Sequence, residues 1–187
     1  MGLLSFKFSA SPNTNDHEVR PLVDGMDFLQ LNGEDLIGLD PPVFFKQDAL
    51  LNGGTLFVGR CACGEIGCDN RAITVEILND KVRWHEKNTI VAEFPLSGYI
   101  EAVRLSAQDT RWECIERTAE RLAETVDFSS LEESGYSFEW ASARIEKGKI
   151  VLSFAHHGEQ RTFDVGWDGL NPEDARTQVS RWVRELA

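Results

Sequence analysis

The sequence predicts an α+β fold built mainly from antiparallel sheet, with two main helices over about 107–126 and 172–186. Segments with an apolar residue at every second position fill most of the chain, as expected of strands that bury one face. The two stretches with helical spacing come in blocks and do not alternate with the strands, so a parallel α/β sheet is not expected. We expect a single domain over 1–187, with a β-rich half (1–97) and a strand–helix–meander–helix half (98–187).

Turn residues divide the first half into short strands. Strands are expected over 3–8, 17–31 (two strands), 55–60, 72–78, 81–85, 89–93 and 99–105. Asp24-Gly25 supplies a tight turn, because glycine accepts a positive φ. Asp40 followed by Pro41 predicts the N-cap and first residue of a short helix, which starts within 40–45 and is ended by Leu50, Leu51 and Asn52-Gly53-Gly54.

The second half contains the two stretches with the clearest helical spacing. Ser106 is expected to cap the first helix, whose apolar residues recur every three or four positions: Trp112, Ile115, Ala119, Leu122 and Val126. Interleaved acidic and basic residues on this segment indicate a solvated helix face. Three strands follow over 136–145, 150–157 and 161–167. Asn171 and Pro172 then begin the final helix.

The charge of the chain limits the classes of partner. The net charge is −12, and the acidic residues are spread evenly over both halves. Nucleic-acid binding needs a clustered Lys/Arg face, and an anionic membrane also attracts basic segments, so neither partner is expected. A basic protein partner fits this charge. No signal-peptide pattern or long apolar run is present, so we expect a cytoplasmic protein.

The most unusual segment holds three of the four cysteines within eight residues: Cys61, Cys63 and Cys68. In a reducing compartment such a cluster indicates metal ligands or redox thiols before a disulfide framework. The flanking strands 55–60 and 72–78 predict that the cluster lies at the tip of a hairpin. In a flat strand two alternate cysteines lie about 6–7 Å apart, so the backbone must bend before both thiolates reach one zinc ion. Glycines at positions 64 and 67 make that bend inexpensive.

A tetrahedral zinc site requires a fourth ligand. His85 is the candidate that we select, because its strand is expected to pair with the strand that follows Cys68. His17, Asp69 and Cys114 are the other candidates. A fourth protein ligand would close the site and make it structural, whereas a water in that position would leave an open and catalytic site.

Two other interpretations of the cysteines remain open. They can be free thiols that pack as small apolar groups. They can also be redox groups, with Cys61 or Cys63 pairing with Cys68 on oxidation. In that case Arg60 and Arg71 would lower a thiol pKa, while Glu65 and Asp69 would raise it.

The segment from Cys61 to Cys68, together with the strand after it and Val82-Arg83-Trp84, resembles a C-x-C-G-x-x-G-C segment of uncharacterised bacterial proteins. The resemblance extends upstream to Leu36-Ile37-Gly38-Leu39-Asp40-Pro41 and covers about residues 35–86. It implies that this arrangement of cysteines recurs, and it implies no activity.

The function that these observations favour is binding without catalysis. The sequence lacks nucleophile-elbow, H-E-x-x-H, P-loop and G-x-G-x-x-G motifs. We expect a non-enzymatic protein with a small structural zinc site, whose acidic surface captures a basic protein, as a toxin-immunity protein does. The alternative is a redox or open-site zinc enzyme that uses the same cysteines.

Overall fold

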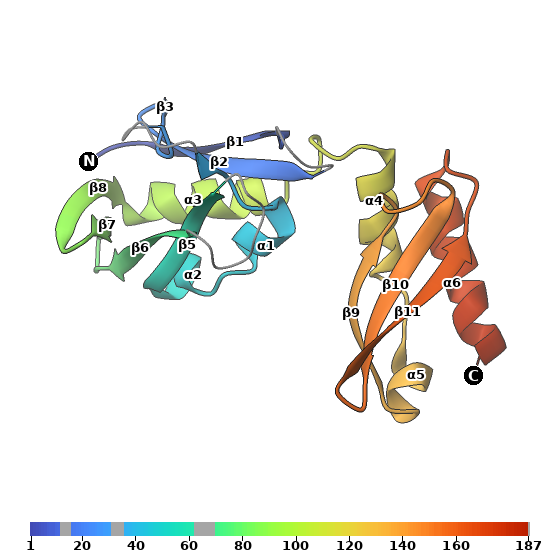
Figure 1. Cartoon of the computed structure of the whole chain (residues 1–187). Coiled ribbons are helices and arrows are strands. Elements are labelled where there is room, and N and C mark those ends of the chain that lie inside the picture. The colour runs from blue at the N-terminus through green and yellow to red at the C-terminus, as the bar shows by residue number, and fades with distance from the viewer. Residues whose placement is uncertain (12–15, 31–35, 62–69, 187) are drawn as a thin grey trace. The chain divides into compact units, whose positions relative to one another are not determined.

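The computed structural model describes residues 1–11, 16–30, 36–61 and 70–186. It divides the chain into two compact units, Met1–Trp112 and Glu113–Ala187, each with its own hydrophobic core (Figure 1). The expected boundary between the halves lay at residues 97 and 98. The structure places it after Trp112, because the segment 96–107 packs on strands of the first unit.

Two antiparallel sheets form the first unit. One has the order β1-β2-β3, with the strands Leu4–Ala10, His17–Val23 and Met26–Asp27. The other has the order β4-β5-β6-β7-β8, with the strands Leu36–Ile37, Gly54–Cys61, Asn70–Ile77, Lys81–Glu86 and Thr89–Pro95. Sequential strands pair in both sheets, which confirms the predicted antiparallel class.

The helices of the first unit are α1 (Pro41–Phe45), α2 (Ala49–Asn52) and α3 (Leu96–Ala107). Proline occupies the first position of α1, as the sequence predicts, but the single helix expected up to residues 50–52 is divided into α1 and α2. The predicted strand over 99–105 is wrong, because this segment belongs to α3. Tyr99 and Val103 lie four residues apart and are both buried, which is the spacing of one helix face.

The second unit contains one antiparallel sheet of order β11-β10-β9 with helices packed against it. Its elements are α4 (Ile115–Ala123), α5 (Ser129–Glu133), β9 (Tyr136–Ser142), β10 (Lys149–His156), β11 (Glu159–Gly166) and α6 (Pro172–Leu186). The predicted three-stranded meander and the final helix are confirmed.

The predicted helix over 107–126 is wrong in its extent. α3 ends at Ala107 and α4 begins only at Ile115, so Ser106 is not an N-cap. Trp112, assigned by its spacing to the helical stripe, instead stacks on Phe8 and contacts the His17 ring. With α3 included, the longer helices are α3, α4 and α6. No helix in the described residues is long and apolar enough to span a bilayer.

Candidate functional site

Cys61 is the member of the cysteine cluster that the structure describes. It is the last residue of β5, pairs with Leu36 of β4, and is half-buried and disulfide-bonded. Cys63, Cys68 and Asp69 lie outside the described residues. β5 and β6 are antiparallel neighbours with Arg60 opposite Asn70, so the predicted strands on both sides of the cluster are present.

His85 lies on β7, opposite Thr74 of β6. Thr74 is four residues beyond Asn70, so the register puts His85 about 13 Å along the strands from the level of Asn70. The His85 ring nitrogen Nε2 lies 3.0 Å from Glu76 Oε2. The structure therefore gives His85 a carboxylate partner and does not bring it beside Cys61.

Of the other described candidate ligands, His17 lies near the end of β5, whereas Cys114 belongs to the second unit. His17 begins β2, and its ring lies 5.2 Å from that of Trp112. Its neighbour Asp16 forms an ion pair of 4.0 Å with Arg60, so the beginning of β2 lies near the end of β5. Cys114 is an exposed free thiol in the second unit. Within the described residues, no three Cys, His, Asp or Glu side chains are arranged to hold a metal ion.

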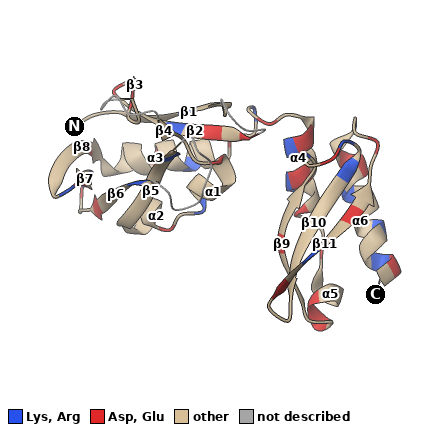
Figure 2. Cartoon of the chain, viewed as in Figure 1, with Lys and Arg blue, Asp and Glu red and all other residues tan. Residues whose placement is uncertain are grey.

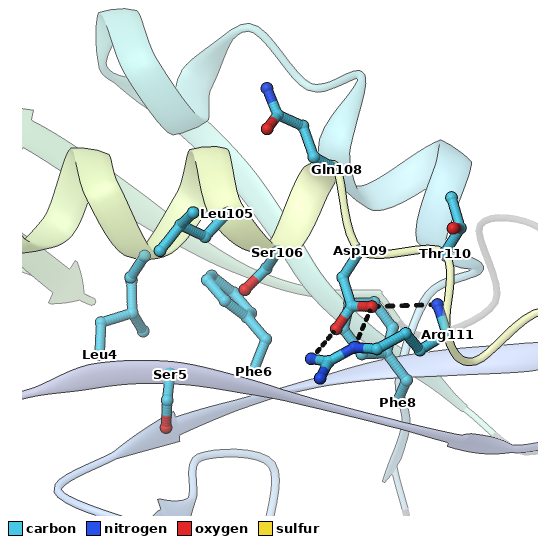
Figure 3. Close-up of a pocket in the computed structure, with 11 residues that line it drawn as sticks. Leu4, Ser5, Phe6, Phe8, Leu105, Ser106, Gln108, Asp109, Thr110 and Arg111 are labelled. Carbon is cyan, nitrogen blue, oxygen red and sulfur yellow. Dashed lines mark hydrogen bonds and ion pairs between the residues drawn. The ribbon is translucent and has the colours of Figure 1, made fainter.

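A groove lies between β1 and α3 in the first unit, with a volume of about 670 Å³. Its apolar lining comes from Leu4, Phe6 and Phe8 of β1 and from Leu105 of α3 (Figure 3). The sequence did not reveal this groove, because residues 99–105 were assigned to a strand. The alternation of Leu4, Phe6 and Phe8 was the available signal for its floor.

Asp109 and Arg111 form the polar end of this groove (Figure 3). Asp109 accepts hydrogen bonds from Arg111 Nε at 2.8 Å, from Nη2 at 2.7 Å and from the Arg111 backbone N–H at 3.0 Å. The Arg111 guanidinium lowers the pKa of Asp109 to about 2, and the carboxylate in turn raises the pKa of Arg111. The pair therefore stays ionised at neutral pH.

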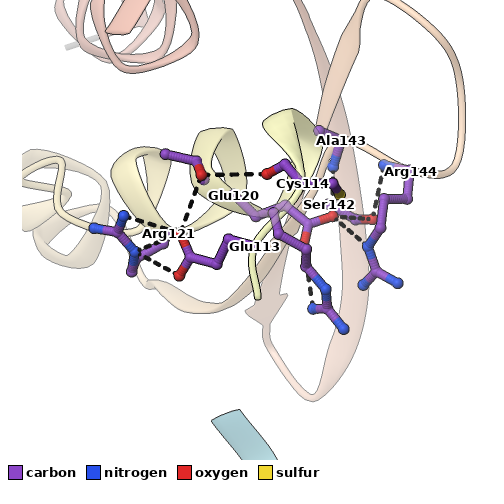
Figure 4. A network of polar contacts seen from close by, with 9 residues as sticks. Glu113, Cys114, Glu120, Arg121, Ser142, Ala143 and Arg144 are labelled. Atoms are coloured by element: carbon purple, nitrogen blue, oxygen red, sulfur yellow. Dashed lines mark hydrogen bonds and ion pairs between the residues drawn. The ribbon is translucent and has the colours of Figure 1, made fainter. Parts of the chain in front are cut away.

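The second unit contains a buried polar network around Glu120 of α4 (Figure 4). Ser142 Oγ, the Ala143 N–H and Arg144 Nε donate to Glu120 Oε1, with distances of 3.0, 2.9 and 2.8 Å. Arg117 donates to the other oxygen at 3.2 Å. The prediction that the charged residues of this helix are solvated is therefore wrong at residues 117 and 120. The network satisfies both carboxylate oxygens and ties α4 to the end of β9, which is a structural role.

Comparisons of the chain with protein-family models, with curated proteins and with solved structures gave no match. The fold and the geometry define the class: an acidic α+β protein of two units, with a cysteine at the end of β5 and a groove beside β1.

Proposed function

We propose that the chain is a non-enzymatic protein that binds a cationic protein partner, in the manner of a toxin-immunity protein. The observation that supports this proposal is that most Lys and Arg side chains form ion pairs with Asp or Glu of the same chain. Among the described residues, twelve of the 19 Lys and Arg side chains form ion pairs with described carboxylates of the same chain. Each such pair presents almost no net charge to a partner.

Acidic and basic residues occur in both units (Figure 2), and the acidic residues are the more numerous. The first unit has 16 acidic and 10 basic residues and the second has 15 and 9, so each has a net charge of −6. Exposed Glu101 on α3 and Glu132 and Glu133 on α5 have no ion pair within the described residues. Long-range attraction to a positive surface speeds association and selects such a partner over acidic ones.

Affinity capture with the full chain tests this function. A cell lysate from the source of the chain is applied at 50 mM salt, and bound protein is eluted with a salt gradient. We expect a stoichiometric partner of basic isoelectric point, released near 300 mM salt because screening weakens the attraction. The variant E132Q/E133Q/E185Q removes three exposed carboxylates of the second unit, with Glu185 on α6. It should associate more slowly, by roughly threefold at 50 mM salt.

The matched control is K147Q/R184Q, which removes two exposed cations that have no ion pair within the described residues. It makes the chain more acidic and should retain the partner as well as the unmodified chain does. A partner whose association rate is the same in both variants, or the absence of a basic partner, would contradict the proposal.

We also propose that the reduced chain holds one structural zinc ion through Cys61, Cys63 and Cys68. Support comes from the pairing of Arg60 with Asn70, which brings the two ends of the cysteine segment onto neighbouring strands. A cysteine in a disulfide offers no thiolate, so the proposal concerns protein purified with reductant. The fourth ligand is His85 in the sequence-based proposal, and His17 is the alternative histidine.

Elemental analysis of reduced protein, purified without added metal, should find about one zinc per chain. Cys61→Ser should lower both the zinc content and the melting temperature, because metal binding is coupled to folding. Zinc loss in His85→Gln but not in His17→Gln would support His85, and the reverse result would assign His17. Metal-free protein with reactive thiols would exclude the site.

The disulfide at Cys61 favours a second candidate, a thiol–disulfide exchange protein. In this reaction a dithiol reductant, such as dithiothreitol, first reduces the chain. A chain thiolate then attacks a disulfide of the substrate, forms a mixed disulfide and releases the first substrate thiolate. A second chain thiolate attacks the mixed disulfide, which releases the second substrate thiolate and restores the disulfide of the chain. The test measures reduction of a fluorescent disulfide probe. Turnover that is lost in Cys61→Ser would favour this candidate over zinc.

A further inference from the structure

One edge of β1 carries backbone groups that pair with no other strand among the described residues. The Asp24 N–H donates to Leu3 O, and the Leu3 N–H donates to Asp24 Oδ1, so the backbone of residue 3 faces β2. Backbone groups alternate sides along a strand, so those of Leu4, Phe6 and Phe8 face away from β2. In the described part of the chain, no backbone hydrogen bond joins these outward groups to another strand.

One backbone group on this edge of the chain already forms a hydrogen bond with another strand. The Gly2 N–H, which faces outward by the same alternation, donates to Glu93 O of β8 at 2.7 Å. Beyond this contact the edge continues along Phe6 and Phe8, where the groove lies. A free strand edge is a template for another chain, since its N–H and C=O groups are spaced for main-chain hydrogen bonds.

The groove beside this edge has an apolar part, a polar end and no net formal charge. Leu105 is 62% exposed and lines the apolar part of the groove, so an apolar side chain of a bound segment could cover it. The formal charges lining the groove are those of Asp109 and Arg111, which neutralise each other. Neighbouring Glu101 and Arg104 on α3 also carry opposite charges.

We propose that this groove, formed by the outer edge of β1 and by α3, binds an extended, uncharged segment of the partner protein as an added β-strand. The proposal rests on the proposed function. The groove would bind the partner's strand, whereas the acidic residues of the chain would attract the partner's positive charges. Residues 4–8 offer outward groups for about five partner residues, at about 3.3 Å per residue. Alternate apolar side chains of the segment would cover Leu105, Phe6 and Phe8.

A second copy of the chain is a poorer occupant. Antiparallel pairing of two β1 edges would bring together two chains that each carry a net charge of −12. Repulsion between like charges opposes that association, whereas a cationic partner would be attracted. The net charge of the whole chain therefore opposes a second copy and favours a segment that belongs to a cationic protein.

Selection with a phage-displayed library of random octapeptides tests the groove in the full chain. We expect enriched peptides with apolar residues at alternate positions and little charge. Leu105→Asp should weaken their binding at least tenfold, because a carboxylate cannot be desolvated against the apolar lining. Leu170→Asp is the matched control, since Leu170 is 76% exposed and belongs to the other unit. It should bind the peptides as the unmodified chain does.

Amide hydrogen exchange, measured by NMR with a selected peptide, identifies the edge itself. The amides of Phe6 and Phe8 should become protected at least tenfold on binding, whereas those of Ser5 and Lys7, which face β2, should change little. Peptides that bind Leu105→Asp equally well would overturn the proposal. So would a dimer of the chain that Leu105→Asp dissociates. A basic partner that is captured independently of Leu105 would overturn this inference and leave the proposed function standing.

Discussion

Tyr99 is a buried side chain in the core of the first unit, and only 1% of its surface is exposed. Its ring packs against Phe94 and against the edge of Trp84. Burial raises the pKa of Tyr99 to about 12, because the phenolate would lose its hydration. The hydroxyl therefore stays protonated in the folded protein over a pH range in which an exposed tyrosine ionises.

This raised pKa predicts a loss of stability at alkaline pH. Between about pH 10 and 12 the unfolded chain releases the Tyr99 proton and the folded chain keeps it, so the free energy of unfolding falls as pH rises. The contribution at pH 11 is about 1 kcal/mol. Urea titrations of the first unit at pH 9 and 11 should show a smaller decline in Tyr99→Phe than in the unmodified chain or in Tyr136→Phe. An equal decline in Tyr99→Phe would contradict the prediction.

Glu120 is a buried carboxylate, and its partners make a second residue-scale prediction. Glu120→Gln replaces one acceptor oxygen by an amide donor and leaves Arg117 and Arg144 without their shared anion. Breaking a buried ion pair from one side costs about 3–5 kcal/mol. The free energy of unfolding of the second unit, from urea titration, should fall by that amount. Exposed Glu132→Gln should change it by less than about 0.5 kcal/mol, and a similar value for both variants would contradict the structural role.

At the scale of elements, α3 shows why the local sequence pattern alone does not predict whether a segment is a helix or a strand. Its sequence contains the β-branched Ile100 and Val103, which favour a strand, and Gly98, which disfavours a helix. Packing decides the outcome, because the helix buries Tyr99 and Val103 in the core of the first unit. Propensity is a weak preference that tertiary contacts override.

Gly98 makes this conclusion testable. An added Cβ at this position would meet no atom within 4 Å, and the residue does not have a positive φ. Gly98→Ala should therefore stabilise the first unit by about 0.5–1 kcal/mol, because alanine loses less backbone entropy on entering a helix. At Gly38, by contrast, a Cβ would lie 2.1 Å from Val19 O, and Gly38→Ala should destabilise the same unit. Thermal unfolding of both variants measures the two effects, and destabilisation by Gly98→Ala would contradict the first.

The strands were more predictable than the helices and the sites. Apolar residues at every second position, together with the turn residues between strands, predicted β5, β6, β7 and the hairpins of the second unit. This pattern is informative because a strand that buries one face must place its apolar side chains on that face. The position of His85 was not predictable, since it depends on how far β7 slides along β6. The groove depends on the approach of α3 to β1, which is a tertiary contact that no local pattern encodes.

At the scale of the whole molecule, the division after Trp112 separates two hydrophobic cores. Each core is lined by residues of its own unit, with buried Trp84 in the first and buried Trp167 in the second. Units with separate cores can unfold as separate cooperative transitions. The variants described above act on one core each, so they can show whether the two units are independent.

We predict two unfolding transitions for the full chain. In urea titrations followed by the indole NMR signals, the Trp84 signal should report the first unit and the Trp167 signal the second. Glu120→Gln should lower the urea midpoint of the Trp167 transition and leave that of Trp84 unchanged, because the midpoint follows the stability of the unit that is altered. Gly38→Ala should lower the urea midpoint of the Trp84 transition and leave that of Trp167 unchanged. Coincident transitions that both variants shift together would contradict the prediction, since they would show that the chain unfolds as one cooperative domain.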